Sequence, residues 1–393
     1  MFLNFFGDKM KKEETLAKNE LLNNTIWVHF SSLQDARVQD NQRYEFKHLI
    51  IAIICGMICG ANNVDSIVNY IESKIDWFRE ILGLEKPPSY STIWWLLLLI
   101  NPEELNKAFM SFVQDIRQGL GIEESKEKEA IAIDGKTSRG TGRKGIKALH
   151  TVSAWSSSIQ LILGQVKTSE KSNEITAIPK LLELLDLNNK VISIDAMGCQ
   201  SAIAKQIVEG GGDYILALKG NQETLHEEVK EAFNGLTKDI YDTKMSEAEE
   251  IEKGHGRIEK RRVKVSQNVE WLKKTKNWNS IKSIVEVESI RMIGAEKTQE
   301  KRYYISSLKE GAGNFLKWIR SHWGVESMHW TLDVAFKNDD FQGHTGNLAE
   351  NFSALQRLTL VLLKQETSIK KSIPKKRERA GWNNEYLLKI IGV

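Results

Sequence analysis

Cysteine and net charge are scarce in this sequence, and both shortages narrow the class of protein. Three cysteines in 393 residues (Cys55, Cys59 and Cys199) cannot build a disulfide framework, and their odd number favours a reducing compartment. Cys55 and Cys59 stand four residues apart in an apolar run, which suits one face of a buried helix better than a zinc site. A net charge of +3 does not by itself indicate a nucleic-acid partner, so the placement of the charges has to decide.

Long hydrophobic runs are missing as well. The longest, "LIIAIICGMICGA" at residues 49–61, is shorter than the ~20 residues that a membrane helix needs. The N-terminus does not show the charged, apolar and small-residue regions of a signal peptide in the required order. Hydrophobic and charged fractions of 41% and 27% are ordinary for a globular protein. We therefore expect a cytoplasmic protein with no membrane partner.

Residues 1–122 are predicted to form an all-helical N-terminal domain. Apolar residues recur there at three- and four-residue spacing, with Gly or Pro between the periodic segments. Asp65 and Pro102 stand where a helix cap and a first-turn proline are expected. The charged stretch "EESKEKE" at 123–129 is predicted to be a solvated linker.

The periodicity changes after the predicted linker. Short apolar runs and amphipathic segments between residues 128 and 235 predict the order β-β-β-α-β-α-β-α. Three meandering strands followed by αβ units match a ribonuclease-H-like core, in which the first strand lies beside and parallel to the fourth. The predicted fold class is therefore α/β.

Two acids end apolar strands in this region, Asp134 in "AIAID" and Asp195 in "VISID". Sites in open sheets form at the carboxyl ends of strands where the strand order switches, so the two carboxylates are expected to face one another. The alternative is that each is an ordinary strand-end or helix-cap aspartate. Two carboxylates about 4 Å apart repel by roughly 4 kcal/mol at an effective dielectric near 20, unless a proton or a cation is shared. Oxygen ligands favour Mg²⁺ or Mn²⁺, and two such ions suit in-line phosphoryl displacement.

A third acid is expected from the helix near residue 326. His322, Glu326, His329 and Asp333 are spaced four, three and four residues apart and form one polar stripe, with Glu326 the best candidate. The solvated side of an amphipathic helix gives the same pattern. Residues 236–310 are predicted to be a charge-rich β insertion, 311–365 the last helical part of the core, and 366–393 a basic C-terminal tail.

Basic clusters are the candidates for DNA contact, although charge runs are often only solvated faces. Trp271 and Trp278 are candidates for stacking on an unpaired base, with core packing as the alternative. Trp318, Trp323 and Trp330 are expected to pack the last helix onto the sheet. The cationic candidates are Lys136 and Arg139 after Asp134, Lys219 at a strand end, Arg257, Arg261 and Arg262 in the insertion, and Lys370, Lys371, Lys375, Lys376, Arg377 and Arg379 near the C-terminus.

The motifs "AIDGKT", "KSNEITAIPKLLELLDL", "ISIDAMGCQ", "GGDYILALKGNQ", "IRSHWGVESMHWTLDVAF" and "NLAENF" occur in an order that resembles bacterial insertion-sequence transposases of the H-repeat-associated type. These belong to the DDE group, named for three metal-binding acids, and the resemblance runs from about residue 30 to near the end. It implies that Asp134, Asp195 and Glu326 are the catalytic and metal-binding residues, with Arg320 and His322 as further DNA contacts.

The resemblance also implies the reaction. Water attacks the phosphodiester at the ends of the element, and the freed 3′-hydroxyl then attacks target DNA, with Mg²⁺ or Mn²⁺, as two ions, and no organic cofactor. The partners implied are the terminal inverted repeats and target DNA, and synapsis of two ends implies a homodimer.

This sequence departs from the family pattern at one point that bears on the site. One residue is missing between Glu326 and His329, which turns everything after it by about 100° on a helix. The roles of His329 and Asp333 are therefore in question. Two other interpretations stay open: a DNA-binding remnant that has lost catalysis, and a metal-dependent nuclease unconnected with transposition.

Overall fold

The computed structural model describes residues 25–37, 43–120, 127–168, 174–234, 245–254, 256–272, 278 and 280–392. The chain divides into two compact units. The first comprises Met1–Glu123, Thr137–His150 and Met328–Val393, and the second comprises Glu124–Lys136 and Thr151–Ser327. The helix α11 (Ala312–Phe336) contributes to both units, since the division falls after Ser327. Most of the predicted linker at 123–129 lies outside the described residues.

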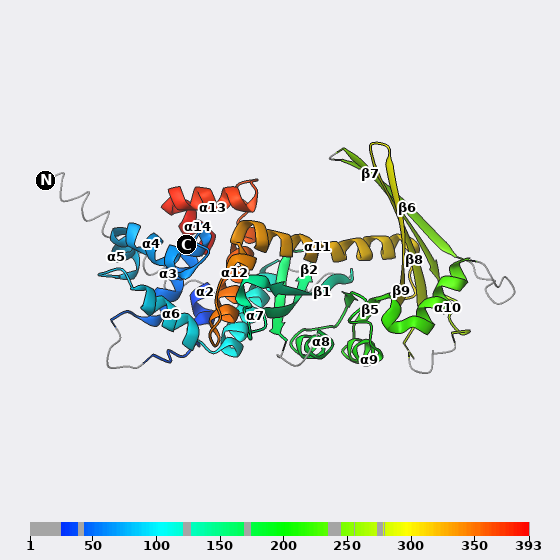
Figure 1. The fold of residues 1–393 in the computed structure, drawn as a ribbon, viewed down its shortest axis with the longest axis horizontal. Helices are drawn as coiled ribbons and strands as arrows, with labels where there is room; N and C mark the ends of the chain where they lie inside the picture. The colour runs from blue at the N-terminus through cyan, green and yellow to red at the C-terminus, as the bar shows by residue number, and fades with distance from the viewer. Residues whose placement is uncertain are drawn as a thin grey trace. The chain divides into compact units, whose positions relative to one another are not determined.

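The first unit is built mainly of helices around a central one, α12 (Leu348–Gln365). This helix is buried along most of its length and packs against α3, α6, α7, α13 and α14 (Figure 1). The other helices of the unit are α2 (Thr25–Phe30), α3 (Phe46–Ile58), α4 (Val64–Ser73), α5 (Ile75–Leu82), α6 (Tyr90–Leu99), α7 (Pro102–Gly119), η3 (Arg139–Thr141), η6 (Asn338–Asp340), α13 (Ile373–Trp382) and α14 (Asn384–Ile391).

Side-chain caps explain where several of these helices begin. Asn63 and Ser66 form a capping box at the start of α4, so Asp65, which we expected as the cap, lies in the first turn instead. Asn101 caps α7 by accepting from the backbone N–H of Glu103 at 2.9 Å, and Pro102 occupies the first turn as predicted.

The segment predicted to be a basic tail is folded into α13 and α14, and two of its cations are buried. The Arg377 guanidinium donates to the Met57 carbonyl at 2.8 Å and to Asn62 Oδ1 at 2.9 Å. The Lys376 ammonium donates to the Leu363 carbonyl at 2.9 Å. These two side chains satisfy carbonyls at the ends of α3 and α12, so they are unavailable for DNA in this conformation.

The second unit is organised around one nine-stranded sheet of order β3-β2-β1-β4-β5-β9-β8-β7-β6. β4 pairs in parallel with both β1 and β5, which confirms the predicted pairing of the first and fourth strands. The predicted β-β-β-α-β-α-β-α order is confirmed too. Its elements are β1 (Glu129–Ser138), β2 (Leu149–Ser156), β3 (Leu161–Lys167), α8 (Glu174–Glu183), β4 (Lys190–Ile194), α9 (Ser201–Glu209), β5 (Asp213–Leu218), η4 (Gly220–Gln222) and α10 (Glu223–Asn234).

Four antiparallel strands extend the same sheet beyond β5, in the region predicted to be a β insertion. They are β6 (Ser246–Gly254), β7 (Arg257–Ser266), β8 (Ser283–Ile293) and β9 (Glu296–Ser306). The sequence indicated the last three but not β6, because "SEAEEIEKG" has no apolar face for a period-two pattern to reveal.

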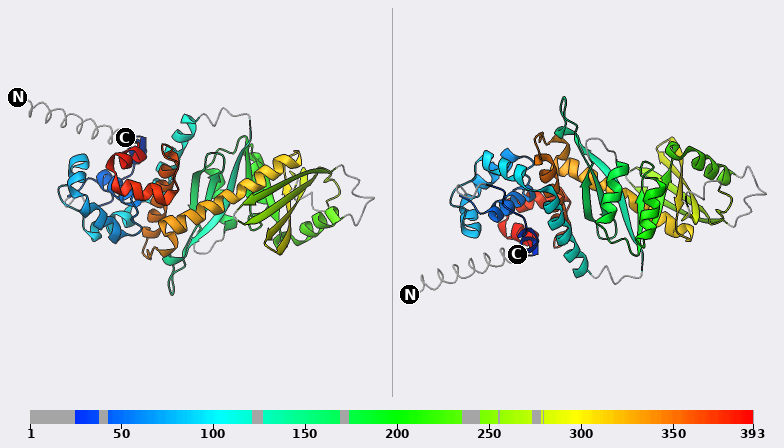
Figure 2. Two further views of the ribbon diagram at one scale, coloured as in Figure 1. Left: turned by 90° about the horizontal axis from the view of Figure 1, so that it is seen from above. Right: turned by 90° about the horizontal axis from the view of Figure 1, so that it is seen from below.

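Helices cover both faces of the sheet in this unit. The N-terminal part of α11 lies on one face, and α8 and α9 lie on the other (Figures 1 and 2). Phe315, Trp318 and Ile319 of α11 pack into a core with Val191 and Val285 of the strands. Burial of this apolar stripe fixes how α11 is rotated about its axis, and so which of its side chains face the strand ends. Among the described residues, no helix combines the length and the apolar character needed to cross a membrane.

Candidate active site

Asp134 and Asp195 lie level with one another on neighbouring parallel strands. The β1–β4 ladder runs from Glu129↔Lys190 to Ile133↔Ile194, so the two aspartates are the next residue on each chain. Adjacent strands are about 4.8 Å apart, which brings the two side chains close together. Asp134 is inside β1 rather than at its tip, because this strand continues to Ser138.

Glu326 joins the two aspartates in one pocket of about 260 Å³ in the second unit. The packing of α11 explains the position of Glu326. Ile319 faces the core, and His322 and Glu326 follow one and two turns later on the same side of the helix. The pocket is lined by Asp134, Ser193, Ile194, Asp195, Ala196, Ile215, Ala217, Lys219, Arg302, Tyr304, Ile319, His322, Trp323 and Glu326. Three acids far apart in the sequence therefore share one cavity.

The Asp195 carboxylate is held by backbone donors in an unfavourable electrostatic environment. Its Oδ1 accepts from the N–H groups of Met197 at 3.0 Å and Gly198 at 3.3 Å. Burial raises the pKa of Asp195, and the charges of Glu174 and Asp134 raise it further, against those two hydrogen bonds. Glu174 was not among the predicted site residues, because an acid in the first turn of a helix is also a common capping feature.

His322 stands among the three acids. Its Nδ1 is 2.9 Å from Ser193 Oγ, which ties α11 to β4 two residues before Asp195. Burial lowers the pKa of His322, while the charges of Asp134, Glu326 and Asp195 oppose this shift. The residue predicted to contact DNA therefore also connects the helix of the third acid to the strand of the second.

The carboxylate oxygens of Asp134, Asp195 and Glu326 are suitable ligands for a hard divalent cation, although these side chains are not positioned to coordinate one together. Carboxylate oxygens are the ligands that Mg²⁺ and Mn²⁺ prefer, and the pKa of Asp195 is raised first by burial and then by the charges of Glu174 and Asp134, which a cation would offset. Among the residues that the structure describes, no group of three or more His, Cys, Asp or Glu side chains is placed to hold a metal ion. Asp134, Asp195 and Glu326 thus fit such an ion by chemistry and location, with ligation requiring side-chain movement.

Cations on the pocket wall are only partly those predicted. Lys219 lines the pocket and is exposed, whereas Lys136 is buried at 7% exposure. Arg139 belongs to the first unit, where its backbone N–H donates to Asp339 Oδ1 at 3.1 Å. Arg302 of β9 also lines the pocket and was not predicted, because no pattern in the sequence shows that β9 pairs with β5.

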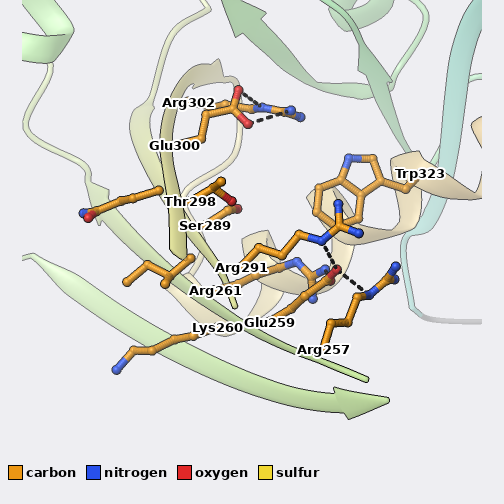
Figure 3. Close-up of a pocket in the computed structure, with 12 residues that line it drawn as sticks. Arg257, Glu259, Lys260, Arg261, Ser289, Arg291, Thr298, Glu300, Arg302 and Trp323 are labelled. Carbon is orange, nitrogen blue, oxygen red and sulfur yellow. Dashed lines mark hydrogen bonds and ion pairs between the residues drawn. The ribbon is translucent and has the colours of Figure 1, made fainter. Parts of the chain in front are cut away.

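The predicted cations of the insertion, and Arg320 of α11, are engaged in ion pairs with glutamates. Arg320 on α11 pairs with Glu250, at 2.6 Å, and with Glu252. Arg262 lies 2.5 Å from Glu247. Arg257 and Arg261 both pair with Glu259 (Figure 3). These residues are therefore not simply a free basic patch.

Some of the predictions for the tryptophans are confirmed, and one is wrong. Trp278 is 4% exposed, which favours core packing over stacking on a base, and the Trp271 indole donates to the Asn268 carbonyl at 2.8 Å. Trp318 packs onto the sheet as predicted. Trp330 is 65% exposed and belongs to the part of α11 in the first unit, so the expectation that it packs α11 onto the sheet is wrong.

Comparison with known proteins defines the class. Residues 125–362 match the family described as "Transposase DDE domain", and residues 27–113 match the family described as "DDE_Tnp_1-associated". The chain belongs to the DDE transposase family, and within it to the H-repeat-associated transposases.

The proteins similar to this chain include a named member of that branch. The chain is 35% identical over 376 residues to the "H repeat-associated putative transposase YhhI" of Escherichia coli K12, covering 93% of this chain and 97% of the relative. It is 37% identical over 273 residues to the "Uncharacterized protein in dhlA 3'region" of Xanthobacter autotrophicus, covering 69% and 90%. A piggyBac transposase synaptic complex with hairpin DNA matches with a TM-score of 0.46 and 9% identity, covering 96% of this chain and 79% of that one.

Proposed function

We propose that this chain is an active transposase, which cleaves DNA at the ends of an insertion sequence and joins them to target DNA in a divalent-metal-dependent reaction. The observation that carries the proposal is the meeting of Asp134, Asp195 and Glu326 in one pocket. Each comes from a different element (β1, the end of β4 and α11), and the sequence motifs around them are those of the family. Element order and the parallel β1–β4 pairing support a ribonuclease-H-like core as the scaffold.

In this proposal different residues of the pocket bind the metal ions, bind the DNA and position Glu326. Asp134, Asp195 and Glu326 would hold Mg²⁺ or Mn²⁺, as two ions, whose chemistry is to activate an oxygen nucleophile and stabilise the leaving oxygen. Lys219 and Arg302 face the same cavity and would bind phosphate oxygens of the scissile strand. The contact of His322 with Ser193 would keep Glu326 within reach of the two aspartates. The terminal inverted repeats and target DNA would be the partners, with two copies of the chain joining two ends.

Cleavage of DNA from the ends of the element that carries the gene tests this proposal. We expect nicking with Mg²⁺ or Mn²⁺ and none with EDTA, and we expect Glu326→Gln to abolish nicking while leaving DNA binding intact. Binding without cleavage by the unaltered protein would favour the catalytically decayed remnant. Cleavage together with a gene that lacks flanking inverted repeats would favour a nuclease without transposition.

A further inference from the structure

A second cavity, of about 420 Å³, lies on one face of the antiparallel strands β7, β8 and β9, beside Trp323 (Figure 3). Side chains alternate between the two faces of a strand, so every second residue of these strands faces the cavity. Arg257, Glu259 and Arg261 are every second residue of β7, and Arg291 of β8 stands opposite Glu259. Arg302 and Trp323 line both this cavity and the acidic pocket, so the two are neighbours within the second unit.

One carboxylate organises the arginines in this cavity. Glu259 Oε1 is 2.8 Å from Arg257 Nε and 3.9 Å from Arg291 Nε, and its other oxygen contacts Arg261. Three guanidinium groups thus converge on a single negative charge. The Arg261 guanidinium also lies over the Trp323 ring at 4.6 Å, which holds it in place.

Positive charge remains in excess on the cavity wall. The side chains on the cavity face include four cations (Arg257, Arg261, Arg291 and Arg302) and two acids (Glu259 and Glu300), a difference of 4 − 2 = +2, whereas the Lys260 side chain points away (Figure 3). Glu252 and Glu249, outside the lining, pair with Arg261 and Lys260 at 2.9 Å each. Arg291 is half exposed and has the longest contact with Glu259, so its guanidinium has donors to offer to a ligand.

We propose that this cavity binds backbone phosphates of an unpaired DNA strand that leaves the acidic pocket. The guanidinium fork that pairs with a carboxylate also fits a phosphate, and Glu259 keeps the three forks aimed at one place. A cavity of about 420 Å³ is of small-ligand size. It accommodates one nucleotide of a single strand, whereas a duplex is too wide to enter. That the ligand is DNA rests on the function proposed above.

The strand geometry supplies a matched control. Arg262 follows Arg261 on β7, so its side chain points to the opposite face of the sheet, where it pairs with Glu247. Both Arg261 and Arg262 were predicted to contact DNA from their place in one basic cluster of the insertion. Arg291 and Arg262 have similar side-chain exposure, 50% and 42%, so a Gln at either position removes one surface guanidinium and is expected to have a small effect on folding.

The experiment measures DNA binding by fluorescence anisotropy in EDTA, on full-length protein carrying Asp195→Asn. The probes are a blunt duplex and the same duplex with a single-stranded tail. Arg291→Gln should weaken binding of the tailed probe about tenfold and lower its salt slope by about 0.7 for one lost single-strand phosphate contact. Blunt duplex binding should not change, and Arg262→Gln should match the parent on both probes.

Other outcomes overturn the proposal, and they can be told apart from failure of the transposase function. Equal effects of the two substitutions, or an equal loss on the blunt duplex, would assign Arg291 to general attraction. Competition by inorganic phosphate as strong as by the single strand would reduce the site to a free-anion site. If tail preference depends on Arg291 but the unaltered protein never cleaves DNA, the inference stands and the proposed function fails.

Discussion

Replacing Asp195 by Asn should make the metal-free protein more stable while abolishing its cleavage of DNA. The substitution removes one of two carboxylates that neighbouring parallel strands hold side by side, and it keeps the oxygen that accepts from Met197 and Gly198. Burial, Glu174 and Asp134 all raise the pKa of Asp195, which means that the folded state disfavours its charged form. Removing that charge should therefore favour folding.

The expected size of the effect follows from the strand spacing. Two unit charges about 5 Å apart repel by roughly 3 kcal/mol at an effective dielectric near 20. Because both side chains are only half-buried, solvent and salt reduce this to about 1–2 kcal/mol. The sign also fixes the pH dependence. A raised folded-state pKa means that the relative stability of the unaltered protein falls as pH rises from the unfolded-state pKa through the folded-state one, then stays level.

Thermal unfolding in EDTA across this pH range, repeated with Mg²⁺, is the measurement. Mg²⁺ should stabilise the unaltered protein and have little effect on Asp195→Asn, because an ion at concentration c that binds only the folded state adds stability by RT ln(1 + c/Kd), and the substitution raises Kd. Asp186→Asn, at an exposed turn position of the same unit, is the control and should show neither effect. A less stable Asp195→Asn protein, or equal stabilisation of both proteins by Mg²⁺, would refute the clustered-acid argument.

Three further substitutions test other features. Ser193→Ala removes the partner of His322 Nδ1 and should lower the cleavage rate with binding of duplex DNA unchanged, as kinetics and anisotropy would report. Asn351→Ala leaves the carbonyls of Leu97 and Ile100, now bonded at 2.8 and 2.9 Å, without that donor and should cost about 1–3 kcal/mol in urea unfolding. Arg357→Met should raise the free energy of unfolding by about 1–3 kcal/mol, because this arginine is fully buried and its Nε and Nη2 have no hydrogen-bond partner among the described residues. Burial also lowers the pKa of Arg357 to about 10, although the charge of Asp333 opposes this shift. A lower urea midpoint for the variant would contradict the prediction.

Local patterns predicted the scaffold of the pocket well. The apolar runs before Asp134 and Asp195 are buried in their strands, with Ala130 alone partly exposed, and burial on both faces is what a run without alternation indicates. Helical spacing placed His322 and Glu326 on one side of α11, where both line the pocket. In each case the information lies within a few consecutive residues.

Features that depend on pairing between distant segments escaped prediction. Arg302 reaches the pocket because β9 lies beside β5, and the ion pairs of the insertion depend on the register of β6 against β7. β6 itself has acids on both faces, so its sequence shows no period-two alternation. Lys376 and Arg377 looked like a solvated tail because composition does not show that backbone carbonyls of α3 and α12 accept from them. The sequence shows which side chains are charged, but it does not show which groups they pair with in the fold.

The residue missing after Glu326 concerns the first unit rather than the acidic pocket. Every residue that lines the pocket precedes Ser327, and the helix passes into the first unit at Met328. Beyond that point Leu332 and Phe336 are fully buried, and the Phe336 ring lies 4.2 Å from the Arg377 guanidinium.

Inserting an alanine after Ser327, which restores the family spacing, tests this view. The insertion would rotate the following helix by about 100° and expose one or both side chains. Large core side chains cost about 2–5 kcal/mol each when lost, so urea unfolding should show a strongly destabilised protein whose cleavage rate per folded molecule does not rise. A stable insertion variant that cleaves faster would mean instead that the present spacing impairs the site.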